Sequence, residues 1–277
     1  AKTHPVLATL VLGFGNTTGG WLAHDYVHGR GKWCATMRNF GAIFCGLSSK
    51  WWSEKHNKHH AFTNVVGVDE DIMVEPLLYL WPPSQDREMP YRGLQHIYWP
   101  LPFSLTFLVW RVASVITAYK KRLGAEGACL ALHYALLAVL VPWPVAVGHV
   151  FIGGLLTATL VTVTHTAEEY LLDTDEPLGF VEAQFRTSRD AQCNDPLSTY
   201  VWGGMQRQLE HHLFPTMPRY KYEALAPLVQ QFAADNDLEY RITDQWKILT
   251  DNVENLKTVG TAPVNPLSPP PGFCDVV

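Results

Sequence analysis

Clustered histidines are the residues of this sequence best placed to do chemistry. The stretch Trp51–His60 carries His56, His59 and His60 at positions i, i+3 and i+4. On a helix, side chains three and four residues apart lie on the same face. Neutral imidazole is the commonest protein ligand for transition metals. The spacing therefore predicts a metal-binding face on one helix.

Two further clusters have similar spacing. His24 and His28 are four residues apart, and Gln208 opens a cluster that ends in His211 and His212. Seven histidines exceed the four ligands that one zinc ion usually takes, and they suit two metal ions. Imidazole also binds iron, copper and nickel, so the ligand type leaves the metal open. We expect the rest of the chain to bring the three clusters together.

An eighth ligand is predicted at His165, which ends an apolar segment beside Glu168 and Glu169. The alternative is that His165 binds no metal and lies at a helix C-terminus because the helix dipole favours a histidine there. His149 precedes His165 by 16 residues, about 24 Å along a helix, which excludes it as a ligand. We interpret His133, within another apolar segment, as a packed histidine or a substrate-tunnel residue.

Several carboxylates accompany the clusters. Asp25, Glu54 and Glu210 lie next to or near cluster histidines, where each could accept the second N–H of a ligating imidazole. Surface charge on a solvated helix is an equally good interpretation. Asp69 and Asp71 either support the same imidazoles or begin a turn.

Composition limits the function classes. The 277 residues are 47% hydrophobic with a net charge of −5, which suits one large domain and makes nucleic acid an improbable partner. Five scattered cysteines indicate no disulfide framework. No signal peptide is predicted, and the absence of HExxH weakens a metalloprotease reading. We expect one domain over residues 1–257 and a disordered proline-rich tail over 258–277.

Long apolar segments indicate a membrane protein. Residues 5–23 are uncharged and long enough to cross a bilayer as a helix, although a buried helix of a soluble protein is the alternative. Residues 125–165 predict a helical hairpin with its turn at Pro142–Pro144. Residues 101–118 are also apolar, but prolines at their start and Arg111 at their centre favour an interfacial helix from which Arg111 snorkels.

The clusters can share a site only if they lie on one side of the membrane. The 125–165 hairpin supplies the even number of crossings that this requires between His60 and Gln208. Every Lys and Arg except Lys2 then lies on the cluster side, which indicates that this side is cytosolic. The predicted fold is an all-α integral membrane helical bundle with a cytosolic helical cap, which carries a histidine-rich dimetal site.

With these clusters, the chain resembles the membrane fatty acid desaturase family over about residues 20–235. Its three histidine boxes read HxxxH, HxxHH and a third box that ends in HH. The third box, Gln208–Pro215, begins with Gln as in the front-end subgroup, which includes acyl-lipid and sphingolipid desaturases. Trp51-Trp52 before the second box and Asn64 after it fit the same pattern.

The resemblance implies two non-haem iron ions, O2, and electrons from cytochrome b5 and its reductase or from ferredoxin. The implied reaction inserts a cis double bond between an existing double bond and the carboxyl end of an acyl chain, in polyunsaturated lipid biosynthesis. The substrate would be an acyl lipid or acyl-CoA in the bilayer, and the endoplasmic reticulum is favoured over a plastid membrane. The implied metal ligands are His24, His28, His56, His59, His60, His165, His211 and His212, with Gln208, Asp25 and Asn64 beside them.

The chain departs from the front-end pattern at its start. His4-Pro5 is followed by Val6 instead of the His-Pro-Gly-Gly motif of a fused cytochrome b5 domain, and the family's additional first helix does not precede residue 5. We expect either a truncated chain or a separate electron donor. Three alternatives stay open. They are a diiron fatty acyl or sphingolipid hydroxylase, a haem protein with His133, His149 or His165 as axial ligand, and a zinc-dependent membrane hydrolase.

Overall fold

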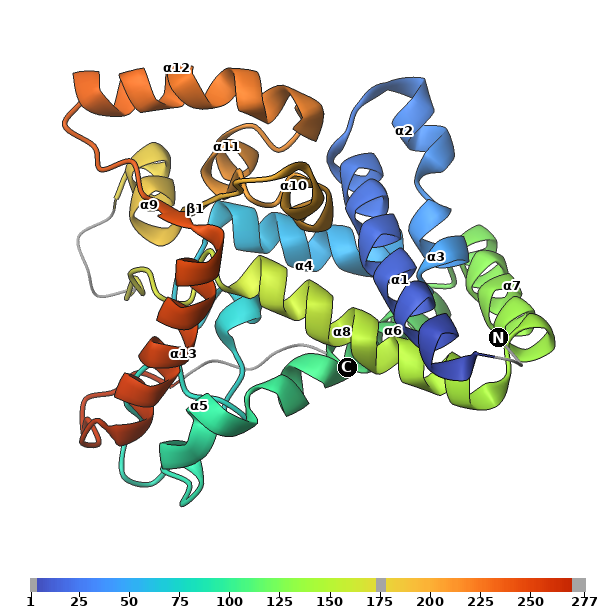
Figure 1. The fold of residues 1–277 in the computed structure, drawn as a ribbon, viewed down its shortest axis with the longest axis horizontal. Coiled ribbons are helices and arrows are strands. Elements are labelled where there is room, and N and C mark those ends of the chain that lie inside the picture. The colour runs from blue at the N-terminus through green and yellow to red at the C-terminus, as the bar shows by residue number, and fades with distance from the viewer. Residues whose placement is uncertain (1–3, 173–177, 271–277) are drawn as a thin grey trace. The chain divides into compact units, whose positions relative to one another are not determined.

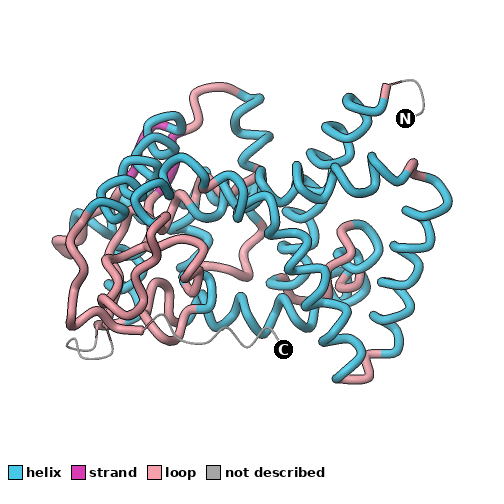
Figure 2. The backbone as a smooth tube through the Cα atoms, turned by 90° about the horizontal axis from the view of Figure 1, so that it is seen from below, coloured by secondary structure: helices cyan, strands magenta, loops and turns pink. Residues whose placement is uncertain are grey.

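A computed structural model describes residues 4–172 and 178–270 of the chain (Figure 1). Helices dominate these residues, and two short strands form the one sheet among them (Figure 2). The chain divides into two compact units. The first unit contains residues up to His56 together with Phe103–Thr159, and the second contains Asn57–Pro102 together with the residues from Leu160 onward.

The first unit holds the apolar helices. Its helices are α1 (Pro5–His28), α2 (Gly31–Met37), α3 (Phe40–Phe44), most of α6 (Pro100–Lys120), α7 (Gly124–Leu140) and most of α8 (Trp143–Thr162). Helix α4 (Ser49–Ala61) begins in the first unit and ends in the second.

Glycines allow the long helices of the first unit to pack closely. A Cβ atom on Gly13 of α1 would lie 2.7 Å from Ile152 of α8, and one on Gly154 would lie 2.5 Å from the Ser104 carbonyl oxygen of α6. Larger residues would push the helices apart, as at small-residue contacts between membrane helices. Thr17 of α1 also donates a hydrogen bond to the Gly153 carbonyl at 3.3 Å.

Three of the described helices are long and apolar enough to cross a membrane, namely α1, α6 and α8. The predicted helix at residues 5–23 is confirmed, and it continues to His28, so the first histidine cluster lies in its last turn. Two helices and a turn predicted for residues 125–165 are found as α7 and α8, but α7 has only 17 residues and is not among the helices long enough to cross a membrane, so two membrane crossings by this pair stay a prediction.

The expectation that Arg111 snorkels toward water is wrong, whereas the interfacial placement of its helix stays a prediction. Arg111 is only 5% exposed, and its Nε atom donates to the Cys45 carbonyl at 2.9 Å. Its Nη2 atom lies 3.3 Å from Nε2 of His149. Buried polar groups thus satisfy the guanidinium, and α6 meets the length and apolarity criteria for a span. Just beyond the last turn of α6, Lys121 pairs with Glu54 of α4, so this end of α6 lies beside the helix with the second cluster.

The second unit is a mixture of short helices and loops. Its elements are α5 (Gln95–Tyr98), α9 (Phe180–Thr187), β1 (Asp190–Gln192), α10 (Pro196–Trp202), α11 (Gln208–Leu213), α12 (Tyr222–Asp235), β2 (Ile242–Asp244), α13 (Gln245–Thr261) and the 3-10 turns Glu70–Ile72, Arg92–Leu94 and Arg219–Lys221. Strands β1 and β2 are parallel, with Asp190 opposite Ile242. Phe185 of α9, Leu209 of α11 and Val229 of α12 form one of its hydrophobic clusters.

The predicted disordered tail starts too early. Helix α13 continues to Thr261, and the next residues are held by hydrogen bonds. Asn265 N donates to the Pro83 carbonyl at 2.9 Å, and Arg87 Nη2 donates to the Pro269 carbonyl at 2.9 Å. The prediction is therefore wrong for residues 258–270, while residues 271–277 lie outside the described residues.

Candidate metal centre

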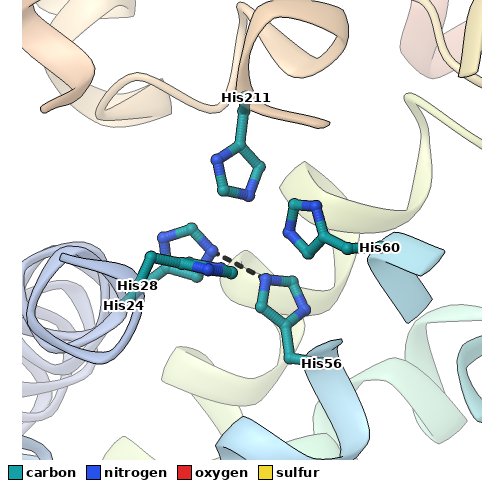
Figure 3. Close-up of side chains that lie close together, drawn as sticks. All are labelled: His24, His28, His56, His60 and His211. Atoms are coloured by element: carbon teal, nitrogen blue, oxygen red, sulfur yellow. Dashed lines mark hydrogen bonds between the residues drawn. The ribbon is translucent and has the colours of Figure 1, made fainter. Parts of the chain in front are cut away.

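Three histidines from the first two clusters meet in the first unit (Figure 3). His24 and His28 lie one turn apart on α1, and their ring centroids are 4.6 Å apart. The His56 ring of α4 lies 4.8 Å from the His24 ring and 4.9 Å from the His28 ring. Nε2 of His24 and Nε2 of His56 are 2.8 Å apart. All three rings are buried, so the helices hold three imidazoles in one small space.

A second set of three histidines meets in the second unit. His59 of α4, His165 after α8 and His212 of α11 are buried, and their ligand nitrogens lie within 4.8 Å of one another. The ring centroid of His59 is 5.0 Å from those of both His165 and His212. The set draws one histidine from each of three segments that are far apart in the sequence.

The three rings of this second set share one orientation. Each has its Nδ1 atom bound to an oxygen outside the set, which leaves Nε2 directed at the other rings. The Nδ1 partners are Oδ2 of Asp69 for His59, the Thr187 carbonyl for His165 and Oε1 of Gln184 for His212, each at 2.8 Å. An outer hydrogen bond of this kind fixes the tautomer and orientation of a metal-binding histidine.

Gln208 lies among the inward nitrogens of this set. Its amide Nε2 atom is 2.9 Å from Nε2 of His165 and 3.1 Å from Nε2 of His212. The amide donates here, so both ring nitrogens accept and carry no proton. This is the ring state that binds a metal ion.

The remaining cluster histidines, His60 and His211, also lie together in the second unit, with ring centroids 4.5 Å apart (Figure 3). The His60 ring stacks on the His212 ring at 4.3 Å. Nδ1 of His211 lies 3.2 Å from the Tyr222 hydroxyl. This pair therefore adjoins the second set through His212.

Burial favours neutral imidazole in the second set. Burial, followed by the facing His59 ring, lowers the pKa of His165 to about 4. Burial, followed by the facing His60 ring, also lowers the pKa of His212. For Asp69, burial raises the pKa, but the His59 ring and the backbone N–H groups of Asp71 and Asn64 outweigh it and bring it to about 2. Asp69 is thus an ionised acceptor for His59.

Two other predicted site residues, Asn64 and Asp25, differ in how closely they contact the histidines. Asn64 Nδ2 donates to the carbonyl oxygens of His165 and Glu169, both at 3.0 Å, and so holds the backbone that bears His165. Asn64 has a φ of 56°, a left-handed conformation that asparagine tolerates. Asp25 Oδ1 lies 4.0 Å from Nδ1 of His24, beyond hydrogen-bond distance.

Two carboxylates left open by the sequence lie in other surroundings. Glu54 pairs with Lys50 at 3.1 Å and with Lys121, as a solvent-facing charge would. Glu210 is buried, and the Tyr240 hydroxyl donates to its Oε1 at 2.9 Å. Burial, followed by the neighbouring Asp190 carboxyl, raises the pKa of Glu210 to about 9.

Sequence reasoning missed two outer partners of the second set. Gln184 and Thr187 both belong to α9, and no histidine or motif marks that helix. Gln184 also donates from Nε2 to the His60 carbonyl at 3.1 Å. The one available signal is the amphipathic spacing of α9, which predicts a packed face without saying what it contacts.

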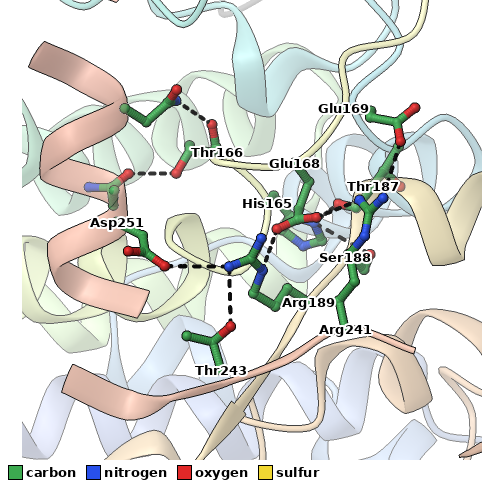
Figure 4. A network of polar contacts seen from close by, with 12 residues as sticks. His165, Thr166, Glu168, Glu169, Thr187, Ser188, Arg189, Arg241, Thr243 and Asp251 are labelled. Carbon is green, nitrogen blue, oxygen red and sulfur yellow. Dashed lines mark hydrogen bonds and ion pairs between the residues drawn. The ribbon is translucent and has the colours of Figure 1, made fainter. Parts of the chain in front are cut away.

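Ion pairs hold the segment around His165 (Figure 4). The Glu168 side chain is 2% exposed and pairs with Arg189 at 2.5 Å and with Arg241 at 2.7 Å. Arg189 also lies 3.5 Å from Asp251 of α13. Because the two guanidinium groups come from distant segments, they fasten the turn after α8, in which His165 lies.

This chain is similar in sequence to several known proteins. The family model described as fatty acid desaturase matches residues 2–244. The Delta(6)-fatty-acid desaturase of Caenorhabditis elegans is 30% identical over 87% of this chain and 61% of its own length. The Delta(5) fatty acid desaturase of the same organism is 31% identical over 87% of this chain and 60% of its own length. An acyl-lipid 8-desaturase of Rebecca salina is 30% identical over 91% of this chain and 63% of its own length.

Proposed function

The chain belongs to the fatty acid desaturase family, and we propose on that premise that it inserts a cis double bond into a fatty acyl chain in an O2-dependent reaction. The new bond would lie between an existing double bond and the carboxyl end, in polyunsaturated lipid biosynthesis. Relatives named as Delta(6), Delta(5) and 8-desaturases support this reaction type. Because the chain spans about three fifths of the length of these relatives, the proposal concerns the whole protein.

One observation carries the proposal most directly. His59, His165 and His212 direct Nε2 toward one another while oxygen acceptors hold each Nδ1 atom. A cluster that served only packing would gain nothing from turning three ligand nitrogens toward one another. A metal ion would gain three ligands at once, so the donor set fits a transition metal.

We assign two iron ions to the eight predicted ligands. Helix α4 carries three of them within two turns, so one rigid element would contribute to both ions. The ions, when bound, would supply the O2-dependent oxidation of the acyl chain. The eight assigned ligands are His24, His28, His56, His59, His60, His165, His211 and His212.

The other polar residues would position these ligands. Asp69, Gln184 and the Thr187 carbonyl hold the outward nitrogens, and Asn64 fixes the backbone at His165. We propose that the Gln208 amide orients His165 and His212 and faces the acyl chain or O2. Asp25, 4.0 Å from Nδ1 of His24, would support that ring through its charge and not through a hydrogen bond.

The apolar helices would accommodate the substrate. We propose that side chains of residues 5–23 and 125–165 line the acyl tunnel and exclude water from the reacting methylenes. Cytochrome b5 with its reductase, or ferredoxin, would deliver electrons. The excess of Lys and Arg on the cluster side supports a cytosolic centre. The resemblance to the family alone favours the endoplasmic reticulum membrane over a plastid membrane, and we propose that location.

A feeding experiment tests the reaction. The full natural protein would be expressed in a host that lacks polyunsaturated lipids, together with cytochrome b5, and supplied with defined unsaturated fatty acids. We expect a new double bond on the carboxyl side of an existing one, located by mass spectrometry. His59→Ala should abolish the product, whereas His133→Ala should retain it.

The outcomes separate the alternatives. A hydroxylated acyl chain in place of a new double bond would assign the protein to the diiron hydroxylases. A Soret band without non-haem iron would support a haem protein. A purified protein that holds zinc and cleaves an acyl ester would overturn the proposal in favour of a hydrolase.

A further inference from the structure

A groove lies between the last turns of α6 and the first half of α7, within the first unit. Its volume is about 800 Å³, and its lining runs from Val115 to Leu123 and from Gly124 to Tyr134. None of the predicted metal ligands lines it. The groove is therefore a feature of the apolar helices, separate from the histidine sets.

The floor of the groove is apolar and firmly packed. Ala118 of α6 and Leu130 of α7 are buried, and both pack against Ala42 of α3. Val115 and Ala131 extend the floor along the two helices. Five residues of α7 line the groove between Gly124 and Tyr134, and this part of the helix is about 15 Å long. This shape suits an extended hydrocarbon chain.

The mouth of the groove is basic. Lys120 and Arg122 line it, and no ion pair or side-chain hydrogen bond joins either of them to a residue that the structure describes. The neighbouring Lys121 pairs with Glu54. Glu126, in the first turn of α7, is buried and accepts a hydrogen bond from Ser48. Two positive charges without an anionic partner among the described residues therefore lie at one end of the apolar groove.

Aromatic residues place this mouth at the membrane surface. Tyr119 lines the groove next to Lys120 and Arg122, and Tyr134 lines it further along α7. Tyrosine, Lys and Arg gather where a membrane helix reaches the headgroup region, because their polar ends contact water while their stems contact lipid. The long apolar helices of this unit support the same placement.

We propose that this groove binds an anionic glycerophospholipid. One acyl chain lies along Val115, Leu130 and Ala131, and the phosphate lies against Lys120 and Arg122. A free phosphate would leave the apolar floor uncovered, and an uncharged lipid would leave both cations unpaired. The proposal requires neither bound iron nor desaturase activity, so it stands or falls separately from the proposed function.

Binding to the delipidated full-length protein tests this directly. Native mass spectrometry would follow phosphatidylglycerol, diacylglycerol with the same chains, and inorganic phosphate, each added alone. At roughly 1 kcal/mol for each basic residue near an anionic lipid, or about fivefold in affinity, we expect phosphatidylglycerol to bind roughly 25-fold more tightly than diacylglycerol. Equal binding of the two lipids, or saturable binding of phosphate alone, would overturn the proposal.

Two sets of variants locate the site. A Cβ atom on Gly127 meets nothing within 4 Å, and Gly127 lines the groove, so Gly127→Leu should place a side chain in the groove and remove most phosphatidylglycerol binding. Lys120→Gln and Arg122→Gln should each weaken it about fivefold. Val139→Leu, on an 81% exposed position of α7, and Lys32→Gln on α2 are matched controls that should bind as the natural protein does. Full binding by Gly127→Leu with an unchanged melting temperature would exclude the groove.

Discussion

The Asp69 carboxylate accepts a hydrogen bond from the Nδ1–H of His59 across 2.8 Å, and Asp69 is completely buried. The carboxylate also accepts from the backbone N–H groups of Asn64 and Asp71. These bonds keep Asp69 fixed and ionised. His59 is thereby held with Nε2 directed toward His165 and His212.

Asp69→Asn is the first test of this relationship. The amide can offer an N–H to the ring in place of an acceptor, which favours the wrong His59 tautomer. We expect iron affinity to fall 10- to 100-fold, the usual effect of removing such an outer partner. Iron titration of the purified protein would measure it. Asp71→Asn, at 3.5 Å from the same nitrogen, should cause a smaller loss, and equal losses would contradict the assigned role.

Gln208→Leu removes the amide that contacts His165 and His212 while it keeps the side-chain volume similar. We expect product formation to fall at least about tenfold, because both rings lose a partner that orients them. Gln231→Leu on the exposed face of α12 should leave the rate unchanged. A normal rate with Gln208→Leu would show that the amide only fills space.

His133→Ala should leave bound iron unchanged, whereas His59→Ala should lower it. Nδ1 of His133 donates to the Ile43 carbonyl at 2.9 Å, which is a packing contact in the first unit. Iron per polypeptide, measured by plasma emission spectrometry, distinguishes the two variants. Loss of iron from His133→Ala would contradict the assignment of this histidine to packing.

Arg111→Met should destabilise the first unit by about 1–3 kcal/mol, because the buried Cys45 carbonyl loses its donor. The melting temperature in detergent would report the change. Lys32→Met, at an exposed position of α2, should shift stability by less than about 0.5 kcal/mol. If both variants melt alike, the hydrogen bond to Cys45 contributes nothing to stability.

Glu168→Gln should destabilise the protein by about 3 kcal/mol, since it leaves Arg189 and Arg241 without their buried partner. It should also weaken iron retention, because the turn that bears His165 loses its anchor. Glu239→Gln is the matched control. Glu239 pairs with the same Arg241 at 3.0 Å but is 73% exposed, and an exposed pair contributes only about 0–1 kcal/mol. Equal effects of the two substitutions would show that burial of Glu168 is unimportant.

The sequence is sufficient to predict the helical faces and turns that depend on residues close together in the chain. The spacing of His24 and His28 fixes their shared helical face, and the prolines at 142 and 144 mark the turn between α7 and α8. In each case the relevant contact lies within a few residues along the chain.

Contacts between distant segments were not predictable. From the sequence alone, Arg111 is interpreted as an interfacial charge. The structure shows that the Cys45 carbonyl, 66 residues away, is its buried acceptor. From the sequence alone, Gln184 is an ordinary polar residue of an amphipathic helix. In the structure its side chain contacts His212. A single sequence carries no sign of such partners, because glutamine and backbone carbonyls form hydrogen bonds almost anywhere.

The outward hydrogen bonds of His59, His165 and His212 have a further consequence for metal exchange. Freezing a side chain costs conformational entropy, on the order of 1 kcal/mol for each. Here folding has already imposed that ordering, so an incoming ion meets rings that need little rearrangement. The protein should therefore release and regain its metal reversibly, without passing through an unfolded state.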